Sequence, residues 1–280
     1  MQTQFEVRYA HSPNEVKAMD TAGLRAAFLV EKVFEPDQIS LVYSHYDRLI
    51  VGGAQPVQKQ LTLATIDPLK AEYFLERREL GIINVGEAGT VTADGTSYEL
   101  NFKEALYLGK GTREISFASK NAKNPAKFYL NAAPAHRTCP AKKVTRESAE
   151  IVELGALETA NHRVINKLLV NSVVETCQLQ MGMTELKTGS VWNTMPAHVH
   201  DRRMEAYFYF ELNEGQSVSH FMGQPEETRH LWMQNDQAVI SPPWSVHAGA
   251  GTSNYTFIWG MAGENLDYDD MDKWAITDLK

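Results

Sequence analysis

The sequence predicts an all-β protein made of two small antiparallel β-barrels of the jelly-roll type, with a few short helices. Three observations lead to this prediction. Short runs rich in Val, Ile, Tyr and Phe recur at close intervals, and turn signals such as Gly52-Gly53, Asp94-Gly95 and Gly109-Lys110-Gly111 separate them. The second half of the chain also echoes the first. With 280 residues, 43% of them hydrophobic, the chain is long enough for two modest cores.

The first half is expected to begin with a helical segment, residues 13–33, which is broken near Gly23. After this segment the sequence turns to β structure. The strands expected there are Ile39–His45, Leu49–Val51, Tyr73–Leu75, Ile82–Val85, Thr90–Thr92, Ser97–Leu100, Ala105–Leu108, Arg113–Ala118 and Ala126–Asn131.

Residues 132–161 are expected to connect the two halves, with one helical turn, because prolines and a run of Glu, Ser and Ala replace the β pattern. A second β-rich block follows from Val164 to Ala262, and its clearest predicted strand is Glu175–Glu185. The acidic tail Glu264–Asp272 is expected at the surface. We therefore expect a first domain over 1–135 that includes the helical segment, a connection over 136–161 and a second domain over 162–280.

An internal repeat relates the two halves. Glu76–Val85 echoes Asp201–Phe210 with a slip of one residue, and Leu108–Glu114 stands where Ser241–His247 stands in the second half. The first half has no His-x-His, and Glu114 occupies the position of His247. We therefore expect only the second barrel to bind a metal ion.

The second half carries a pattern typical of a four-ligand metal site on strands. His198 and His200 are two residues apart, so on an extended strand both imidazoles point to the same face, roughly 7 Å apart. Glu205 follows at an odd offset, so a turn or bulge near Arg202-Arg203 must re-aim it. His247 closes the site from a remote strand. Three imidazoles and a carboxylate suit Zn²⁺, Fe²⁺, Mn²⁺, Co²⁺ or Ni²⁺ better than Ca²⁺ or Mg²⁺.

Composition argues against several classes of partner. The net charge is −8 and no basic block is longer than Lys142-Lys143, so a nucleic-acid partner is not expected. No apolar run approaches the roughly 18 residues of a membrane span, and the first residues lack the apolar core of a signal peptide. We expect a cytoplasmic protein in which Cys139 and Cys177 are free thiols.

The motif H-x-H-(x)4-E with a downstream P-x-x-x-x-H, on two copies of a small β-barrel, resembles the bicupins. Two positions depart from the usual cupin pattern: Trp244 replaces a Gly, and Gly251 stands at the usual late Asn. These departures concern the shape of the loop and leave the four ligands in place.

A closer resemblance covers essentially the whole chain. The 5-keto-4-deoxyuronate isomerases, ketol-isomerases of pectin breakdown, are similar over Gly23–Arg25, Phe28–Phe34, Val42–His45, Tyr73–Gly81, Trp192–His198, Met222–Pro225, Glu227–His230 and Thr256–Met261. This resemblance implies a cytoplasmic, zinc-containing homo-oligomer, a hexamer, with one Zn²⁺ per chain. It implies a small anionic keto-sugar as substrate, because the family interconverts 5-dehydro-4-deoxy-D-glucuronate and 3-deoxy-D-glycero-2,5-hexodiulosonate. The family's zinc ligands fall on His198, His200, Glu205 and His247.

An aldose–ketose isomerisation needs a base that moves a proton between adjacent carbons. The sequence leaves this base open, and Glu205 itself is one alternative if it loosens from the metal. The other candidates are Glu185, Lys167, His220 and Tyr207. The substrate carboxylate needs a cation, for which the candidates are Arg163, Lys167, Arg203 and Arg229.

Two rival functions use the same fold. A cupin iron dioxygenase would take up oxygen with Fe²⁺. A non-catalytic sugar-binding bicupin would bind the sugar without exchanging its protons, because a fold alone does not fix a function. The four converging ligands favour a metalloenzyme over a scaffold that only binds sugar.

Overall fold

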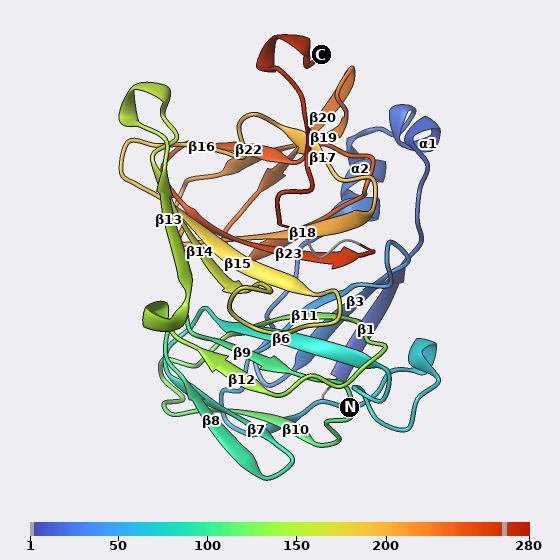
Figure 1. The fold of residues 1–280 in the computed structure, drawn as a ribbon, viewed down its shortest axis with the longest axis vertical. Helices are drawn as coiled ribbons and strands as arrows, with labels where there is room; N and C mark the ends of the chain where they lie inside the picture. Colours follow the sequence, from blue (N-terminus) through green and yellow to red (C-terminus); the bar gives the residue numbers. More distant parts are fainter. Residues whose placement is uncertain (1–2, 265–267) are drawn as a thin grey trace. The chain divides into compact units, whose positions relative to one another are not determined.

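The computed structural model describes residues 3–264 and 268–280, and its contacts divide the chain into two compact units. The first unit holds the residues up to Arg8 together with Lys32–Glu150 and Lys167–Met181. The second holds Tyr9–Glu31, Ile151–Asn166 and Gly182–Lys280. Strands dominate both units (Figure 1), which confirms the all-β prediction.

Two sheets build the first unit. The larger has seven strands in the order β1 (Thr3–Arg8), β3 (Ile39–Ser44), β4 (Ile50–Ala54), β11 (Phe128–Pro134), β6 (Arg78–Asn84), β9 (Ala105–Leu108) and β12 (Lys142–Val144). The smaller has four, in the order β5 (Leu61–Thr62), β10 (Ile115–Ser119), β7 (Gly89–Ala93) and β8 (Thr96–Leu100). The pair β1 and β3 is parallel, whereas β6 runs antiparallel to both β11 and β9.

The core of the first unit lies between these two sheets. Leu80, Ile82 and Leu130 from the larger sheet share one apolar cluster with Val91 and Phe117 from the smaller sheet. Alternating residues of each strand face this cluster, as the period of two along a strand requires.

The second unit is built around a corresponding pair of sheets. The larger has the order β13 (Glu150–Leu154), β14 (Arg163–Leu169), β15 (Gln180–Leu186), β23 (Thr256–Gly263), β18 (Arg203–Phe210), β21 (Gln237–Ser241) and β2 (Leu29–Val30). The smaller has the order β16 (Trp192–Asn193), β22 (Ala248–Gly251), β19 (Val218–Gln224) and β20 (Glu227–Met233). A short pair joins β17 (His198–Val199) to β24 (Asp272–Lys273).

The strand orders confirm the internal repeat. The run β3-β4-β11-β6-β9 in one large sheet has the same connectivity as β14-β15-β23-β18-β21 in the other, and the two small sheets also match. Each unit therefore has the jelly-roll layout predicted for a bicupin. Its two sheets stay separate instead of closing into one continuous barrel.

The helical segment forms two helices, α1 (Pro13–Lys17) and α2 (Thr21–Phe28), and four short 3₁₀ helices lie at Asp67–Leu69, Arg146–Ser148, Leu157–Thr159 and Ile276–Asp278. The predicted break near Gly23 is wrong: the chain breaks between α1 and α2, where the Asp20 side chain accepts a hydrogen bond from the amide of Gly23 and caps α2. None of the helices in the described ranges has the length and hydropathy needed to cross a lipid bilayer.

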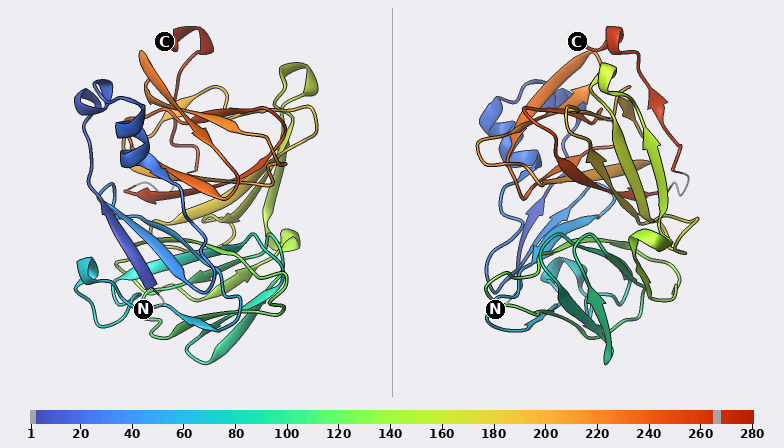
Figure 2. Two further views of the ribbon diagram at one scale, coloured as in Figure 1. Left: turned by 180° about the vertical axis from the view of Figure 1, so that it is seen from behind. Right: turned by 90° about the vertical axis from the view of Figure 1, so that its left-hand side faces the viewer.

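The helical segment lies with the second unit, whereas the sequence placed it before the first barrel. The two helices pack on β19, β20 and β21, and β2 pairs with β21. Figure 2 shows both helices beside these strands. The connection also differs from expectation, because it contains β12 and β13 in addition to its predicted helical turn.

Two predicted strands are wrong for a common reason: long-range contacts hold their residues. Tyr73–Leu75 is irregular, with Phe74 and Leu75 buried in the first core. The predicted strand Glu175–Glu185 begins only at Gln180. The amides of Cys177, Gln178 and Leu179 donate to the buried carboxylate of Glu79 instead of to a neighbouring strand. Both cysteines are free and buried, as expected.

Candidate metal centre and its pocket

Four buried side chains converge in the second unit. His198 lies on β17, His200 directly after it, Glu205 on β18, and His247 directly before β22. One ligand atom from each residue lies within 4.8 Å of all the others. The side chains are at most 8% exposed. We call these four residues the metal cluster.

A tight turn brings Glu205 to the two histidines. Asp201 and Arg202 form this turn, and β18 starts at Arg203, so the predicted change of direction near Arg202-Arg203 is confirmed. The approach of His247 is fixed by hydrogen bonds from the amide of Gly223 to Ser245 Oγ and from the amide of Val246 to the carbonyl of Gly223, both 2.9 Å.

The distances within the metal cluster leave polar atoms facing one another. His198 Nε2 lies 2.9 Å from His247 Nε2, and His200 Nε2 lies 2.8 Å from Glu205 Oε1. Burial, together with the neighbouring His247, lowers the pKa of His198 to about 2, and burial lowers the pKa of His247 to about 4. These two imidazoles are therefore neutral near pH 7, as metal ligands must be.

The orientation of His200 provides a direct test of whether a cation fits. Its Nδ1 donates a hydrogen bond to the carbonyl of Asp270, which leaves Nε2 unprotonated in the neutral ring. Nε2 has no hydrogen-bond partner among the described residues and faces a carboxylate oxygen. Two acceptors at this distance repel unless a cation lies between them. The donor set of three imidazoles and one carboxylate therefore fits a divalent transition metal.

The acidic tail lies at the surface, as predicted, with Glu264, Asp269 and Asp272 exposed, and it also takes part in this site; its residues 265–267 lie outside the described residues. Tyr268, Asp269 and Met271 line the pocket beside the metal cluster. The strand β24 pairs with β17 so that Lys273 stands opposite His198. The backbone pairing of β24 with β17 and the hydrogen bond from His200 Nδ1 to the carbonyl of Asp270 hold the tail in this position.

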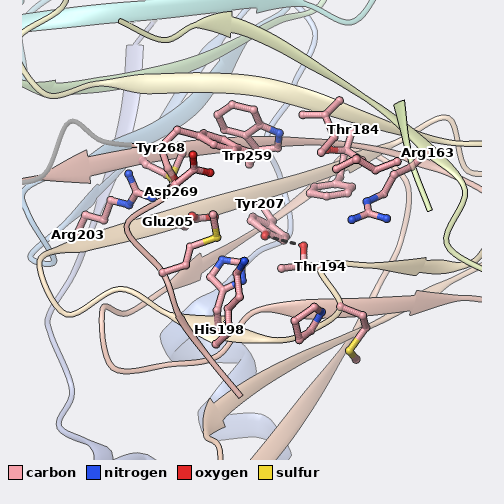
Figure 3. A pocket seen from close by; sticks show the side chains of 18 residues that line it. Arg163, Thr184, Thr194, His198, Arg203, Glu205, Tyr207, Trp259, Tyr268 and Asp269 are labelled. Carbon is pink, nitrogen blue, oxygen red and sulfur yellow. Dashed lines mark hydrogen bonds between the residues drawn. The ribbon is translucent and has the colours of Figure 1, made fainter. Parts of the chain in front are cut away.

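The pocket has a volume of about 250 Å³, which is the scale of a small molecule. Figure 3 shows the side chains that line it. His198 and Glu205 contribute the metal-cluster end, while Arg163, Thr184 and Trp259 come from β14, β15 and β23 of the larger sheet. Apolar side chains complete the walls: Leu154, Ile165, Met195, Phe257, Met261 and Met271.

Tyr207 and Trp259, which both line the pocket, carry buried hydrogen-bond donors. The hydroxyls of Tyr207 and Thr194 are 3.0 Å apart, and burial raises the pKa of Tyr207 well above its usual value, so this phenol is neutral. The indole Nε1 of Trp259 is buried without a hydrogen-bond partner in the described part of the chain. Trp259 lies so close to Gly182 that a Cβ there would be 2.2 Å from its Cζ2.

Of the five predicted bases, the described pocket lining contains Tyr207 and Glu205, and Glu205 belongs to the metal cluster. Glu185 Oε1 accepts a hydrogen bond from Asn166, 2.8 Å away. The ring of His220 is fully buried on β19, where Nδ1 lies 2.7 Å from the hydroxyl of Tyr209. The ammonium of Lys167 pairs with Glu150 at 2.6 Å. These contacts give the last three residues structural roles.

Of the predicted cations, Arg163 and Arg203 line the pocket. Arg203 is 1% exposed and donates from Nη2 to the carbonyl of Tyr268, 2.9 Å away. Arg229 does not line the pocket: its guanidinium donates to the carbonyl of Lys17 and pairs with Glu227.

Sequence reasoning missed Asp269 and Lys273, which also line the pocket. The one signal for them was the aromatic Tyr268 within the acidic tail, because an aromatic side chain there is more easily explained by packing than by exposure to solvent.

Comparison with known proteins places these features in context. The model of the KduI/IolB family matches residues 28–277. A relative from Formosa agariphila, named 4-deoxy-L-threo-5-hexosulose-uronate ketol-isomerase, is 64% identical over 280 residues, with both chains fully covered. One of the same name from Escherichia coli is 56% identical over 99% of this chain and 100% of its own. The crystal structure of an IolB-like protein from Salmonella typhimurium has a TM-score of 0.69 at 14% identity and covers 88% of this chain and 96% of its own, which shows the shared fold.

Proposed function

Because the chain belongs to the KduI/IolB family, we propose that it is a metal-dependent ketol-isomerase of uronate degradation. The reaction interconverts 4-deoxy-L-threo-5-hexosulose-uronate, also called 5-dehydro-4-deoxy-D-glucuronate, and 3-deoxy-D-glycero-2,5-hexodiulosonate. The observation that carries this proposal is the metal cluster at one end of a small pocket. A reaction that moves a proton next to a carbonyl group needs such a site.

We propose Zn²⁺, one ion per chain, held by His198, His200, Glu205 and His247. When bound, the ion supplies Lewis acidity that polarises the substrate oxygens and stabilises negative charge in the enediolate. Zn²⁺ has no redox chemistry, so it suits an isomerase better than an oxygenase.

The chain's own residues bind and orient the sugar. The neutral phenol of Tyr207 and the hydroxyl of Thr194 donate hydrogen bonds to substrate oxygens. The methionine and phenylalanine side chains of the walls exclude water, which strengthens these bonds.

The proton-transfer base fits Asp269 best. It carries the one carboxylate of the described pocket lining that is not part of the metal cluster. In the forward direction Asp269 accepts the proton from C2 of the aldose and, after exchange with solvent, delivers a proton to C1, while the hydroxyl proton of O2 moves to O1, so that no electron leaves the substrate. Tyr207, with its raised pKa, serves as a donor and not as a base.

The oligomeric state, the location in the cell and the partners of the enzyme are also proposals. We propose a homo-oligomer, a hexamer as the resemblance implies, that acts in the cytoplasm on a small anionic keto-sugar. Neither nucleic acid nor a membrane is a partner in this proposal, in keeping with the net charge of −8.

The test combines metal analysis with two assays on the purified protein. We expect about one zinc ion per chain and conversion of the uronate without any added organic cofactor. Oxygen uptake with Fe²⁺ and no isomerisation would support the dioxygenase instead. Binding of the uronate without turnover by the zinc-loaded protein would leave a sugar-binding bicupin.

A further inference from the structure

We propose that Arg163 binds the carboxylate of the substrate, so that the sugar lies with its reacting end at the metal cluster and its acid end at the start of β14. This inference rests on the proposed function, and it adds the direction in which the substrate binds. Arg163 is the first residue of β14 and lines the pocket.

The chemistry of the substrate requires its two ends to be separated. An aldose–ketose isomerisation takes place at C1 and C2, whereas the carboxylate of a hexuronate is C6. Five C–C bonds join the first and last carbons, so an extended chain spans roughly 6 Å. The carboxylate must therefore meet a cation some distance from the group that holds C1 and C2.

The pocket has this arrangement. In Figure 3, Arg163 and Thr184 lie on one side of the hydrogen-bonded pair Tyr207 and Thr194, while His198 and Glu205 lie on the other. The guanidinium of Arg163 points toward the middle of the pocket. A sugar that reaches from the metal cluster to Arg163 passes the hydroxyls of Tyr207 and Thr194, which can bond to its middle oxygens.

Arg163 has donors to spare for a carboxylate. Its Nη1 donates to the carbonyl of Asn161, 2.9 Å away, and no carboxylate pairs with it among the described residues. Burial lowers the pKa of this guanidinium, and the neighbouring Tyr268 and Tyr207 side chains offset this effect only in part. A bound carboxylate would supply a negative charge through a two-pronged pair of hydrogen bonds.

The other two cations of the described pocket lining fit this role less well. Arg203 is almost fully buried and donates to the carbonyl of Tyr268. Lys273 stands opposite His198 in the β17–β24 pair, so it lies at the metal-cluster end, where the reacting carbons bind. Arg163 is the remaining cation.

The test uses Arg163→Gln and Arg163→Lys, with Arg113→Gln as the matched control. Arg113 is exposed, pairs with Glu72 and does not line the pocket. We expect Arg163→Gln to raise the KM for the uronate roughly 10- to 100-fold, the usual effect of losing a charge-assisted hydrogen bond, with a smaller change in kcat. Arg163→Lys should recover part of this loss, because it restores the charge without the two-pronged geometry. Zinc content and the control's KM should not change.

A second measurement does not depend on turnover. Calorimetry on metal-depleted protein compares binding of the uronate with binding of its carboxamide, in which the acid is neutral. Wild type should prefer the uronate, and Arg163→Gln should lose this preference. If Arg163→Gln does not fold, Arg163→Lys carries the comparison, with a preference smaller than that of wild type.

The outcomes separate the two proposals. An unchanged KM and an unchanged preference for the uronate in the Arg163 variants would overturn the inference while the isomerase proposal stands. A zinc-loaded wild type that does not convert the uronate would overturn the proposed function. In that case the calorimetric comparison still decides whether Arg163 recognises the carboxylate.

Discussion

The buried carboxylate of Glu79 in the first unit gives the sharpest stability prediction. Glu79 lies near the start of β6, between β11 and β9, as Glu205 lies near the start of β18, between β23 and β21. It is 0% exposed, and none of its hydrogen-bond partners among the described residues is a histidine. Its two oxygens accept hydrogen bonds from the hydroxyl of Tyr107 at 2.6 Å and from the amides of Cys177, Gln178 and Leu179 at 2.8 Å.

The size of the effect follows from these four bonds. Glu79→Ala leaves three buried amides and one phenol without their acceptor, and breaking a buried charged network of this kind costs roughly 3–5 kcal/mol. Glu79→Gln keeps one oxygen but places an NH₂ group against donors on the other side, so we expect a loss of roughly 2–3 kcal/mol. Glu99→Ala is the control: Glu99 is exposed and pairs with Lys120 at the surface, where a change within about 1 kcal/mol is usual.

Unfolding in guanidinium chloride measures this loss of stability. Because the two units need not unfold together, the first unfolding transition is the one compared between the variants. Zinc content and KM of the folded variants should match those of wild type, because the donors around Glu79 leave it no role as a metal ligand. A Glu79→Ala variant as stable as the Glu99→Ala control would refute the reasoning. So would a Glu79→Gln variant of normal stability that has lost its zinc.

Three further predictions concern the metal cluster and the proton transfer. His247→Ala should abolish tight zinc binding and isomerisation, whereas the control His230→Ala, at an exposed position, should keep both. Metal analysis and a turnover assay measure the two properties. Zinc retained by His247→Ala would contradict the ligand assignment. Burial lowers the pKa values of His198, His220 and His247 to about 2, 3 and 4. The unfolded metal-free chain therefore binds more protons than the native one below about pH 6.5. As the pH is lowered from about 6 to about 4, the free energy of unfolding should fall by up to about 1.4 kcal/mol per histidine for each pH unit. Denaturant unfolding at several pH values measures it. A free energy of unfolding that does not change with pH would show that these rings are protonated in the native state. Asp269→Asn should lower kcat about 100-fold or more with zinc retained, and a normal kcat would exclude it as the base.

The metal cluster was predictable because its signal is local. Two histidines at the spacing of a strand face and a carboxylate after a turn are written within eight residues, 198–205. The repeat was predictable because both copies keep similar runs of residues along corresponding strands. Both predictions depend on short-range geometry, which the sequence states directly.

Features that depend on distant contacts were not predictable. The strand β2 joins β21 across more than 200 residues of chain, and the amides of 177–179 turn away from a strand to meet Glu79 about 100 residues earlier. The tail covers the pocket because β24 pairs with β17. In each case the local pattern favoured another structure, and tertiary contacts that the sequence does not state prevailed.

The most direct test of the account follows the uronate by NMR in D₂O with zinc-loaded and metal-depleted wild-type protein. We expect conversion only by the zinc-loaded protein, with deuterium appearing in the product at the carbon that receives the proton. Equal conversion by the metal-depleted protein would contradict the role of the metal cluster. Conversion without any deuterium in the product would contradict proton transfer by a side chain in contact with solvent.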